Sequence, residues 1–280
     1  MKIALNTDIF NDTGCPAPYL RAIAEAGFTH IHWCHQWSTD FLYCDAEIRR
    51  IKAWFQEYGL TLLDIHGSVG PEKNWFASEE YMRAAGVELV ANRMRMFRAL
   101  EGEGALMMHL PCVMSHSNAA DRANALAQLD NLRRSLDELM PLSRELNVPI
   151  AVENFGYDTF EIIESLLKED PEDFLGLCYD SGHGHIGDDK GLDHLEANKD
   201  RLMALHIHDN DSTCDQHQPP FNGTLDWERF ASILKASPYP RPISFELSGR
   251  HTPFSENLDA FVADAYQRCR KFTLMVRGNE

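Results

Sequence analysis

Eight short apolar runs recur along the chain, and a helix-like stretch follows each of them. Several of the runs are almost continuously apolar, which is typical of strands buried on both faces of a parallel sheet. In chain order the runs are KIALN from Lys2, HIHW from His30, TLLDIHG from Thr61, ALMMHLP from Ala105, PIAVENFG from Pro149, FLGLCYDSGH from Phe174, LMALHIHDND from Leu202 and PISFELSG from Pro242. The eight alternating units predict an α/β fold around a parallel eight-stranded barrel, the (β/α)₈ or TIM barrel.

A doubly wound open sheet is the alternative arrangement for the same alternation of strands and helices. That fold usually has a glycine-rich phosphate-binding turn after its first strand. Here the first run ends in Asn6-Thr7-Asp8-Ile9-Phe10, which is no such turn, so we favour the barrel. No linker rich in glycine, serine or proline divides the chain, and we expect a single domain over residues 1–280.

The stretches between the apolar runs have the marks of helices. Leucines recur every three or four residues from Leu126 to Leu139, which predicts one buried helix face. Gly27, Gly59 and Gly104 are expected to end helices, and Ser255, which is followed by a glutamate, is expected to cap the start of one.

Composition and charge exclude several classes of protein. The net charge is −17, from 43 acidic and 26 basic residues, whereas a nucleic-acid-binding protein concentrates positive charge to neutralise phosphates. The sequence has no run of eighteen apolar residues, so no membrane span is expected, and its N-terminal apolar stretch is too short for a signal peptide. The seven cysteines are scattered and odd in number, which is typical of reduced thiols. We therefore expect a cytoplasmic protein that binds neither nucleic acid nor membranes, and leave its oligomeric state open, a homo-oligomer included.

Residues able to bind a divalent cation end every predicted strand from the third to the eighth, where the function of such barrels resides. They are His66, His109, Glu153, Asp180 with His183, His206 and Glu246. A lone buried histidine or carboxylate is more often structural, but this many at one barrel mouth would repel one another or stay unsatisfied without a cation. The set therefore predicts a metal site.

The stretch from Leu205 to His217, LHIHDNDSTCDQH, offers more ligands around the end of the seventh strand. His208 follows His206 by two positions, so the strand period places both on one face. Asp215 and His217 lie two apart in the loop beyond, where they can close on one further ion.

Four motifs resemble the xylose isomerase-like superfamily of barrels, which includes the AP endonuclease family, ketose 3-epimerases and inosose-pathway enzymes. The motifs are VENFG at Glu153, YDSGH at Asp180, LHIHDND at His206 and SFELSG at Glu246, and the resemblance covers nearly the whole chain. It implies that these four residues hold one divalent ion.

The endonuclease IV branch of this superfamily holds three zinc ions with five additional ligands. The matching positions here are His66, His109, His183, Asp215 and His217, so the resemblance implies that these side chains surround further ions or touch the substrate. Superfamily members related to sugar isomerases also carry a D-x-H loop, so the pattern does not by itself select the hydrolytic branch.

Each branch also differs from this chain. The ketose 3-epimerase branch has a second glutamate six residues after its strand-five glutamate and an arginine six residues after its strand-seven histidine, where this chain has Thr159 and Ser212. The strong negative charge and the lack of basic loops argue against duplex DNA, the substrate of the endonuclease.

Aromatic and cationic side chains near the predicted barrel mouth are candidates for substrate binding. Trp33, His35 and Trp37 follow the second strand in HWCHQW and are expected to form a wall for a sugar-sized ligand, although loop packing explains them equally well. Arg250, in ELSGR, is a candidate for binding a phosphate or carboxylate, and a solvated arginine fits the same pattern.

Three functions fit these features. The first is a divalent-metal-dependent isomerase or epimerase of a sugar, sugar phosphate or cyclic polyol, in which the ion stabilises an enediolate and Glu153 and Glu246 act as opposed catalytic bases, as in the epimerase relatives. The second is a phosphoester hydrolase with two or three zinc ions and a small substrate, and the third is a metal-stabilised binding protein. Carboxylate ligation favours manganese or magnesium and added imidazoles favour zinc, with cobalt also compatible. We favour the isomerase, with zinc or manganese as the cofactor and a small molecule as the partner.

Overall fold

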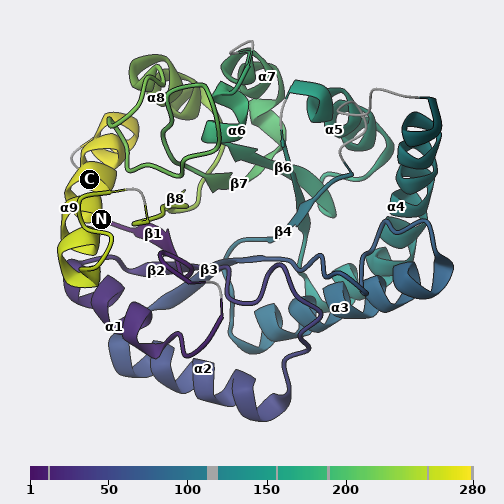
Figure 1. Cartoon of the computed structure of the whole chain (residues 1–280), viewed down its shortest axis with the longest axis horizontal. Helices are drawn as coiled ribbons and strands as arrows, with labels where there is room; N and C mark the ends of the chain where they lie inside the picture. The colour runs from purple at the N-terminus through teal and green to yellow at the C-terminus, as the bar shows by residue number, and fades with distance from the viewer. Residues whose placement is uncertain (12, 112–118, 156, 188–189, 251, 279–280) are drawn as a thin grey trace.

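Eight parallel strands follow one another around a barrel that is enclosed by helices (Figure 1). The computed structural model describes the whole chain except residues 12, 112–118, 156, 188–189, 251 and 279–280, and describes only the backbone of residues 119–125 and 157–159. The strands are β1 (Ile3–Asn6), β2 (His30–Trp33), β3 (Thr61–His66), β4 (Leu106–His109), β5 (Ile150–Glu153), β6 (Leu175–Asp180), β7 (Leu202–His206) and β8 (Ile243–Phe245). Each run predicted to be a strand contains one of them.

Hydrogen bonds just beyond β7 close the barrel. The strands pair in the order of the chain from β1 to β7, and β1 also pairs with β8. The Ile207 amide donates to the Ser244 carbonyl at 3.2 Å, and the Glu246 amide donates to the Ile207 carbonyl at 3.1 Å. These bonds join the last two strands, so the predicted (β/α)₈ barrel is confirmed.

Helices follow the strands and cover the outside of the barrel (Figure 1). They are α1 (Ala17–Ala26), α2 (Asp45–Tyr58), α3 (Glu80–Ala99), α4 (Ala119–Leu146), α5 (Tyr157–Glu169), α6 (Ser181–His185), α7 (Gly191–Asn198), the short 3₁₀ turn η1 (Lys199–Arg201), α8 (Trp227–Ala236) and α9 (Leu258–Arg277). Both α6 and α7 follow β6, and α9 packs against α1 to complete the ring. Among the described residues, no helix is long and apolar enough to cross a membrane.

Side-chain alternation along the strands separates two apolar layers. Leu106 and Met108 of β4 join the large core between sheet and helices, whereas Met107 belongs to a small cluster inside the barrel. The inner cluster consists mainly of small side chains: Ala105, Met107, Ala151, Cys178 and Ala204. Glu153 and His206 come two residues after members of this cluster, so the polar residues lie directly above an apolar floor.

Glycines predicted two of three helix ends correctly. Gly27 and Gly59 follow α1 and α2 in the left-handed conformation, with φ of 109° and 67°. Gly104 does not end a helix, because α3 already stops at Ala99 and Glu101 takes the positive φ of 60°.

Two other details of the predicted helices are wrong. Ser255 caps no helix; the side chain of Asn257, two residues later, accepts the Ala260 amide at 3.0 Å at the start of α9. In α4, Leu126 is 59% exposed, whereas the leucines from Leu129 to Leu139 pack into the core.

Candidate metal centre

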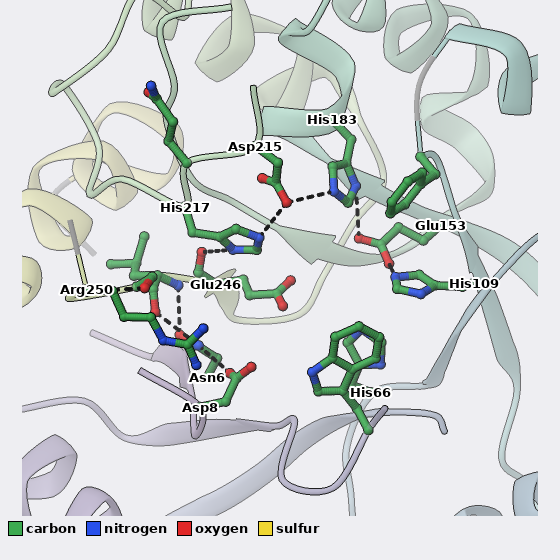
Figure 2. Close-up of a pocket in the computed structure, with 15 residues that line it drawn as sticks. Asn6, Asp8, His66, His109, Glu153, His183, Asp215, His217, Glu246 and Arg250 are labelled. Atoms are coloured by element: carbon green, nitrogen blue, oxygen red, sulfur yellow. Dashed lines mark hydrogen bonds and ion pairs between the residues drawn. The ribbon is translucent and has the colours of Figure 1, made fainter. Parts of the chain in front are cut away.

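Residues of types that bind metals lie at the ends of six successive strands, at one end of the barrel, as the sequence predicts. The residues are His66, His109, Glu153, Asp180 and His206, which are the last residues of β3 to β7, and Glu246, which directly follows β8. All of them except the half-buried His109 are buried. Figure 2 shows several of these side chains directed into one shared pocket.

Glu153, Asp180, His206 and Glu246 form a tight, buried central cluster. Each of the four residues offers one potential ligand atom, and these four atoms all lie within 4.8 Å of one another. Glu153 Oε1 and Glu246 Oε2 approach the same atom, Nδ1 of His206, at 2.9 and 2.8 Å. A ring nitrogen carries at most one proton, so it cannot fully satisfy two carboxylates at once.

Neighbouring residues hold Asp180 in place. The side-chain amide of Asn154 donates to the Asp180 carbonyl at 2.9 Å and accepts its amide at 2.8 Å. The Asp180 carboxylate caps α6 by accepting the His183 amide at 2.7 Å, and Nε2 of His208 lies 3.0 Å from its Oδ1. A Cβ on Gly182 would lie 1.8 Å from the His208 ring, so only glycine permits this approach.

A second cluster shares Glu153 with the central one. Nε2 of His109 lies 3.0 Å from Glu153 Oε2, whereas the other oxygen, Oε1, faces His206. Ligand atoms of His66, His109 and Glu153 lie within 4.8 Å of one another. Burial, together with the nearby His109, holds the pKa of His66 well below its usual value, so this ring is neutral and able to bind a cation.

A third cluster is formed by His183, Asp215 and His217. Oδ2 of Asp215, in the loop after β7, lies 3.3 Å from Nε2 of His183 and 2.9 Å from Nε2 of His217 (Figure 2). Burial opposes charge on both rings, but the surrounding carboxylates raise the pKa of His183 to about 10 and that of His217 to about 9. A metal ion would therefore have to displace protons from this cluster.

Asp209 anchors the loop that carries the third cluster. Its fully buried carboxylate accepts the backbone amides of Gly223 and Leu225 at 2.8 and 3.3 Å and the indole N–H of Trp227 at 3.1 Å. Its backbone pairs with that of Gln218 through two hydrogen bonds of 2.8 and 3.0 Å. The loop is thus fixed at both ends.

Histidines keep the two glutamates ionised. Burial alone would raise the pKa of Glu153, but His206 and His109 hold it well below its usual value. The pKa of Glu246 is lowered in the same way, against its burial, by His206 and His217. At neutral pH both carboxylates are therefore available as bases or as metal ligands.

The second and third clusters and the two glutamates of the central cluster line one pocket at the barrel mouth. Its volume of about 330 Å³ is within the range of small-molecule sites. Asn6, Asp8 and Arg250 lie together on the side of the pocket away from His109 (Figure 2). Phe155 lies beside His109, with ring centroids 5.6 Å apart. The pocket therefore combines an apolar edge with a polar one.

Sequence comparison assigns the chain to a family. The profile of the xylose isomerase-like TIM barrel family matches residues 20–265. The chain belongs to this family. It is 33% identical over 280 aligned positions to the uncharacterized protein y4fM of Sinorhizobium fredii, covering 91% of this chain and 86% of that protein. It is also 30% identical over 115 positions to the uncharacterized protein MJ1614 of Methanocaldococcus jannaschii, covering 38% and 43% of the two chains.

Solved structures with the same fold include several sugar epimerases. A D-psicose 3-epimerase crystallised in the presence of D-fructose has a TM-score of 0.77 at 16% identity, covering both chains completely. A D-tagatose 3-epimerase-like protein has a TM-score of 0.74 at 18% identity, covering 99% and 98% of the chains. The 3-keto-D-glucoside 4-epimerase YcjR from E. coli has a TM-score of 0.72 at 18% identity, covering 97% and 99%. At these identities the likeness is one of fold.

Four side chains were predicted to contact substrate. Two of them, Trp37 and Arg250, line the pocket of this protein. Trp33 is completely buried, and its indole N–H donates to the Tyr43 hydroxyl at 3.1 Å. His35 also bonds to Tyr43, at 2.7 Å, away from the pocket. The structure corrects the prediction for these two residues, because strand alternation turns Trp33 outward to the helices and the chain then leads away from the mouth.

Sequence reasoning missed several polar residues at the site. Asn6 and Asp8 line the pocket from the end of β1, and His32 and Asp64 lie buried inside the barrel. The sequence did contain a pattern from which the inward position of His32 and Asp64 could have been predicted. Asp64 precedes His66 by two positions on a predicted strand, so both face inward, and His32 occupies the register position next to Asp64 on β2.

The central cluster fits a divalent metal ion. Three buried carboxylates lie within reach of one imidazole, and such closely spaced buried charges are costly without a cation. The convergence of Glu153 and Glu246 on one nitrogen of His206 is the arrangement that a shared cation would relieve.

Proposed function

We propose that this protein is a divalent-metal-dependent isomerase or epimerase that acts on a sugar, a sugar phosphate or a cyclic polyol through an enediolate. The observation that carries the proposal is the placement of Glu153 and Glu246, two ionised carboxylates from different strands that converge on one small pocket. Such a pair can remove a proton from one face of a carbon atom and return it to the other. The epimerase neighbours in fold support this class of reaction.

The catalytic residues of this mechanism are Glu153 and Glu246. One of them takes the proton from the carbon next to the substrate carbonyl, and the other delivers a proton to the opposite face for epimerisation. A bound divalent ion would polarise the carbonyl and stabilise the negative charge of the enediolate. The depressed pKa values of both glutamates keep them in the basic form that proton removal requires.

Glu153, Asp180, His206 and Glu246 would hold the ion. Three carboxylates and an imidazole suit manganese, and the additional histidines around them favour zinc. Five more residues of the pocket, which match the additional ligand positions of the endonuclease IV branch, would bind further ions or substrate hydroxyls; they are His66, His109, His183, Asp215 and His217. Trp37 and Arg250 would bind the part of the substrate that lies away from the ion.

Deuterium exchange tests the reaction directly. The metal-loaded protein is incubated in deuterated water with a panel of ketoses, ketose phosphates and inososes. We expect deuterium to enter the carbon next to the carbonyl of at least one compound, because proton removal by a glutamate opens that position to solvent. Absence of exchange across the whole panel would contradict the proposal.

A multi-zinc phosphoester hydrolase is the second candidate, and the three adjacent ligand clusters favour it. Metal ions held side by side activate water and stabilise both the attacking and the leaving oxygen of a phosphoester. Elemental analysis of the purified protein separates the two candidates: we expect one tightly bound ion per chain for the isomerase, and two or three for the hydrolase. Release of alcohol from small phosphoesters without deuterium exchange would decide for the hydrolase.

Duplex DNA is not an expected substrate under either proposal. The net charge of −17 opposes approach of a polyanion. Among the described residues, the pocket lining adds four carboxylates, Asp8, Glu153, Asp215 and Glu246, against one guanidinium, that of Arg250.

A further inference from the structure

A histidine and an aspartate beneath the central cluster have no part in the mechanism above. His32 of β2 and Asp64 of β3 are register partners on neighbouring strands. Their side chains are buried, with 0% and 1% exposure of the two residues. Nδ1 of His32 lies 2.6 Å from Oδ1 of Asp64, so the two form a close pair in the interior of the barrel.

Asp64 fixes the tautomer of the His32 ring. An ionised carboxylate can only accept a hydrogen bond, so the neutral ring carries its proton on Nδ1 and presents a lone pair at Nε2. Among the described residues, none lies in hydrogen-bonding geometry with this Nε2. A buried acceptor without a partner is costly, so this nitrogen is open to a ligand from outside the described residues.

The unpartnered nitrogen belongs to a ring that borders the central cluster. The rings of His32 and His206 are in contact, with centroids 4.2 Å apart and planes inclined by 53°. One potential ligand atom from each of His32, His206 and Glu246 lies within 4.8 Å of the other two. A cation bound to both the His32 ring and the Glu246 carboxylate would be attracted by the carboxylate and would give the ring nitrogen a partner.

We propose that His32 is a fifth protein ligand of the central divalent ion and that Asp64 is the positioning residue that orients its ring. The inference rests on the metal dependence in the proposed function. Histidine ligands of metals commonly donate their second nitrogen to a carboxylate, which fixes the ring and makes the ligating nitrogen more basic. A set of two imidazoles and three carboxylates favours zinc, cobalt or manganese over magnesium.

Metal affinity tests this assignment without reference to activity. Wild type, His32→Ala and Asp64→Asn are titrated with Zn²⁺ and Co²⁺ in competition with a chromophoric chelator. We expect both variants to bind the first equivalent of metal about 10- to 100-fold more weakly. The visible absorption of bound Co²⁺ should also change in position and intensity in His32→Ala, because the ion loses a nitrogen ligand.

His30→Gln is the matched control. His30 is a buried histidine on the same strand, two residues before His32, and its ring bonds to Thr29 and Glu103 instead of the cluster. We expect its metal affinity and Co²⁺ spectrum to match those of wild type. If His32→Ala does not fold, as judged by circular dichroism, His32→Gln replaces it, because the longer amide fills more of the space.

The outcomes separate this inference from the proposed function. Wild-type affinity and an unchanged Co²⁺ spectrum in the His32 and Asp64 variants would overturn the assignment of His32 while leaving the proposed reaction intact. If metal binding depends on His32 but the protein catalyses no deuterium exchange, the assignment of His32 is supported and the proposed reaction is contradicted. A wild-type protein that binds no divalent ion would overturn both.

Discussion

Deuterium exchange should fall by about 10²- to 10⁴-fold when Glu153 is replaced by glutamine, the range lost with a general base. An amide cannot take a proton from carbon at neutral pH. The substitution also removes a negative ligand from two clusters at once, because one oxygen of Glu153 faces His206 and the other faces His109. Exchange is followed by proton NMR on the compound of the panel that reacts fastest, and bound metal by elemental analysis.

Glu145→Gln provides the matched control for this experiment. Glu145 is exposed on α4, so the same change of charge occurs far from the barrel mouth, and we expect wild-type exchange and metal content. Glu246→Gln should behave like Glu153→Gln. Unchanged exchange in Glu153→Gln would contradict its role as a base, and unchanged metal content in Glu246→Gln would show that the central ligand set is wrong.

Replacing Asp209 by alanine should lower the free energy of unfolding by about 3 to 5 kcal/mol. The substitution removes the acceptor of the Gly223 amide and leaves the buried Leu225 amide and Trp227 indole N–H without theirs. A shift of the urea denaturation midpoint and of the thermal midpoint would measure this loss. The third cluster should loosen as well, because its loop loses its anchor.

Asp211→Ala is the comparison variant for stability. Asp211 is two residues away and exposed, and its carboxylate bonds only locally to Thr213 among the described contacts. We expect unchanged denaturation midpoints. Equal midpoints for Asp209→Ala and wild type would show that the buried network around Asp209 does not stabilise the fold.

The barrel was predictable because its signal is repeated. Each of eight buried strands is a short apolar run, and errors in one helix end do not alter the count. The wrong helix ends have local causes. Asn257 and Ser255 are both good caps by residue type, and the choice between them depends on where α9 first meets the core, which the local sequence does not encode.

The convergence of the candidate ligands was predictable for a topological reason. Parallel strands that end at the same rim bring residues far apart in sequence together, so a list of strand ends is already a list of neighbours. The wrong predictions for the substrate-binding residues concern the direction in which a side chain points. Trp33 is adjacent to His32 in sequence but points to the opposite side of β2, towards the helices. Whether a loop residue such as His35 turns back to the mouth depends on tertiary contacts with Tyr43.

The sharing of Glu153 between two clusters has a thermodynamic consequence. Its two oxygens face different histidines, one 2.9 Å from His206 and the other 3.0 Å from His109, so occupants of the two clusters would hold the same carboxylate from opposite sides. Their binding free energies then cannot be independent. If the first occupant changes the affinity of the second by some factor, the second changes the affinity of the first by the same factor. A titration of this protein should accordingly follow a linked isotherm, with the same overall free energy by either order of loading.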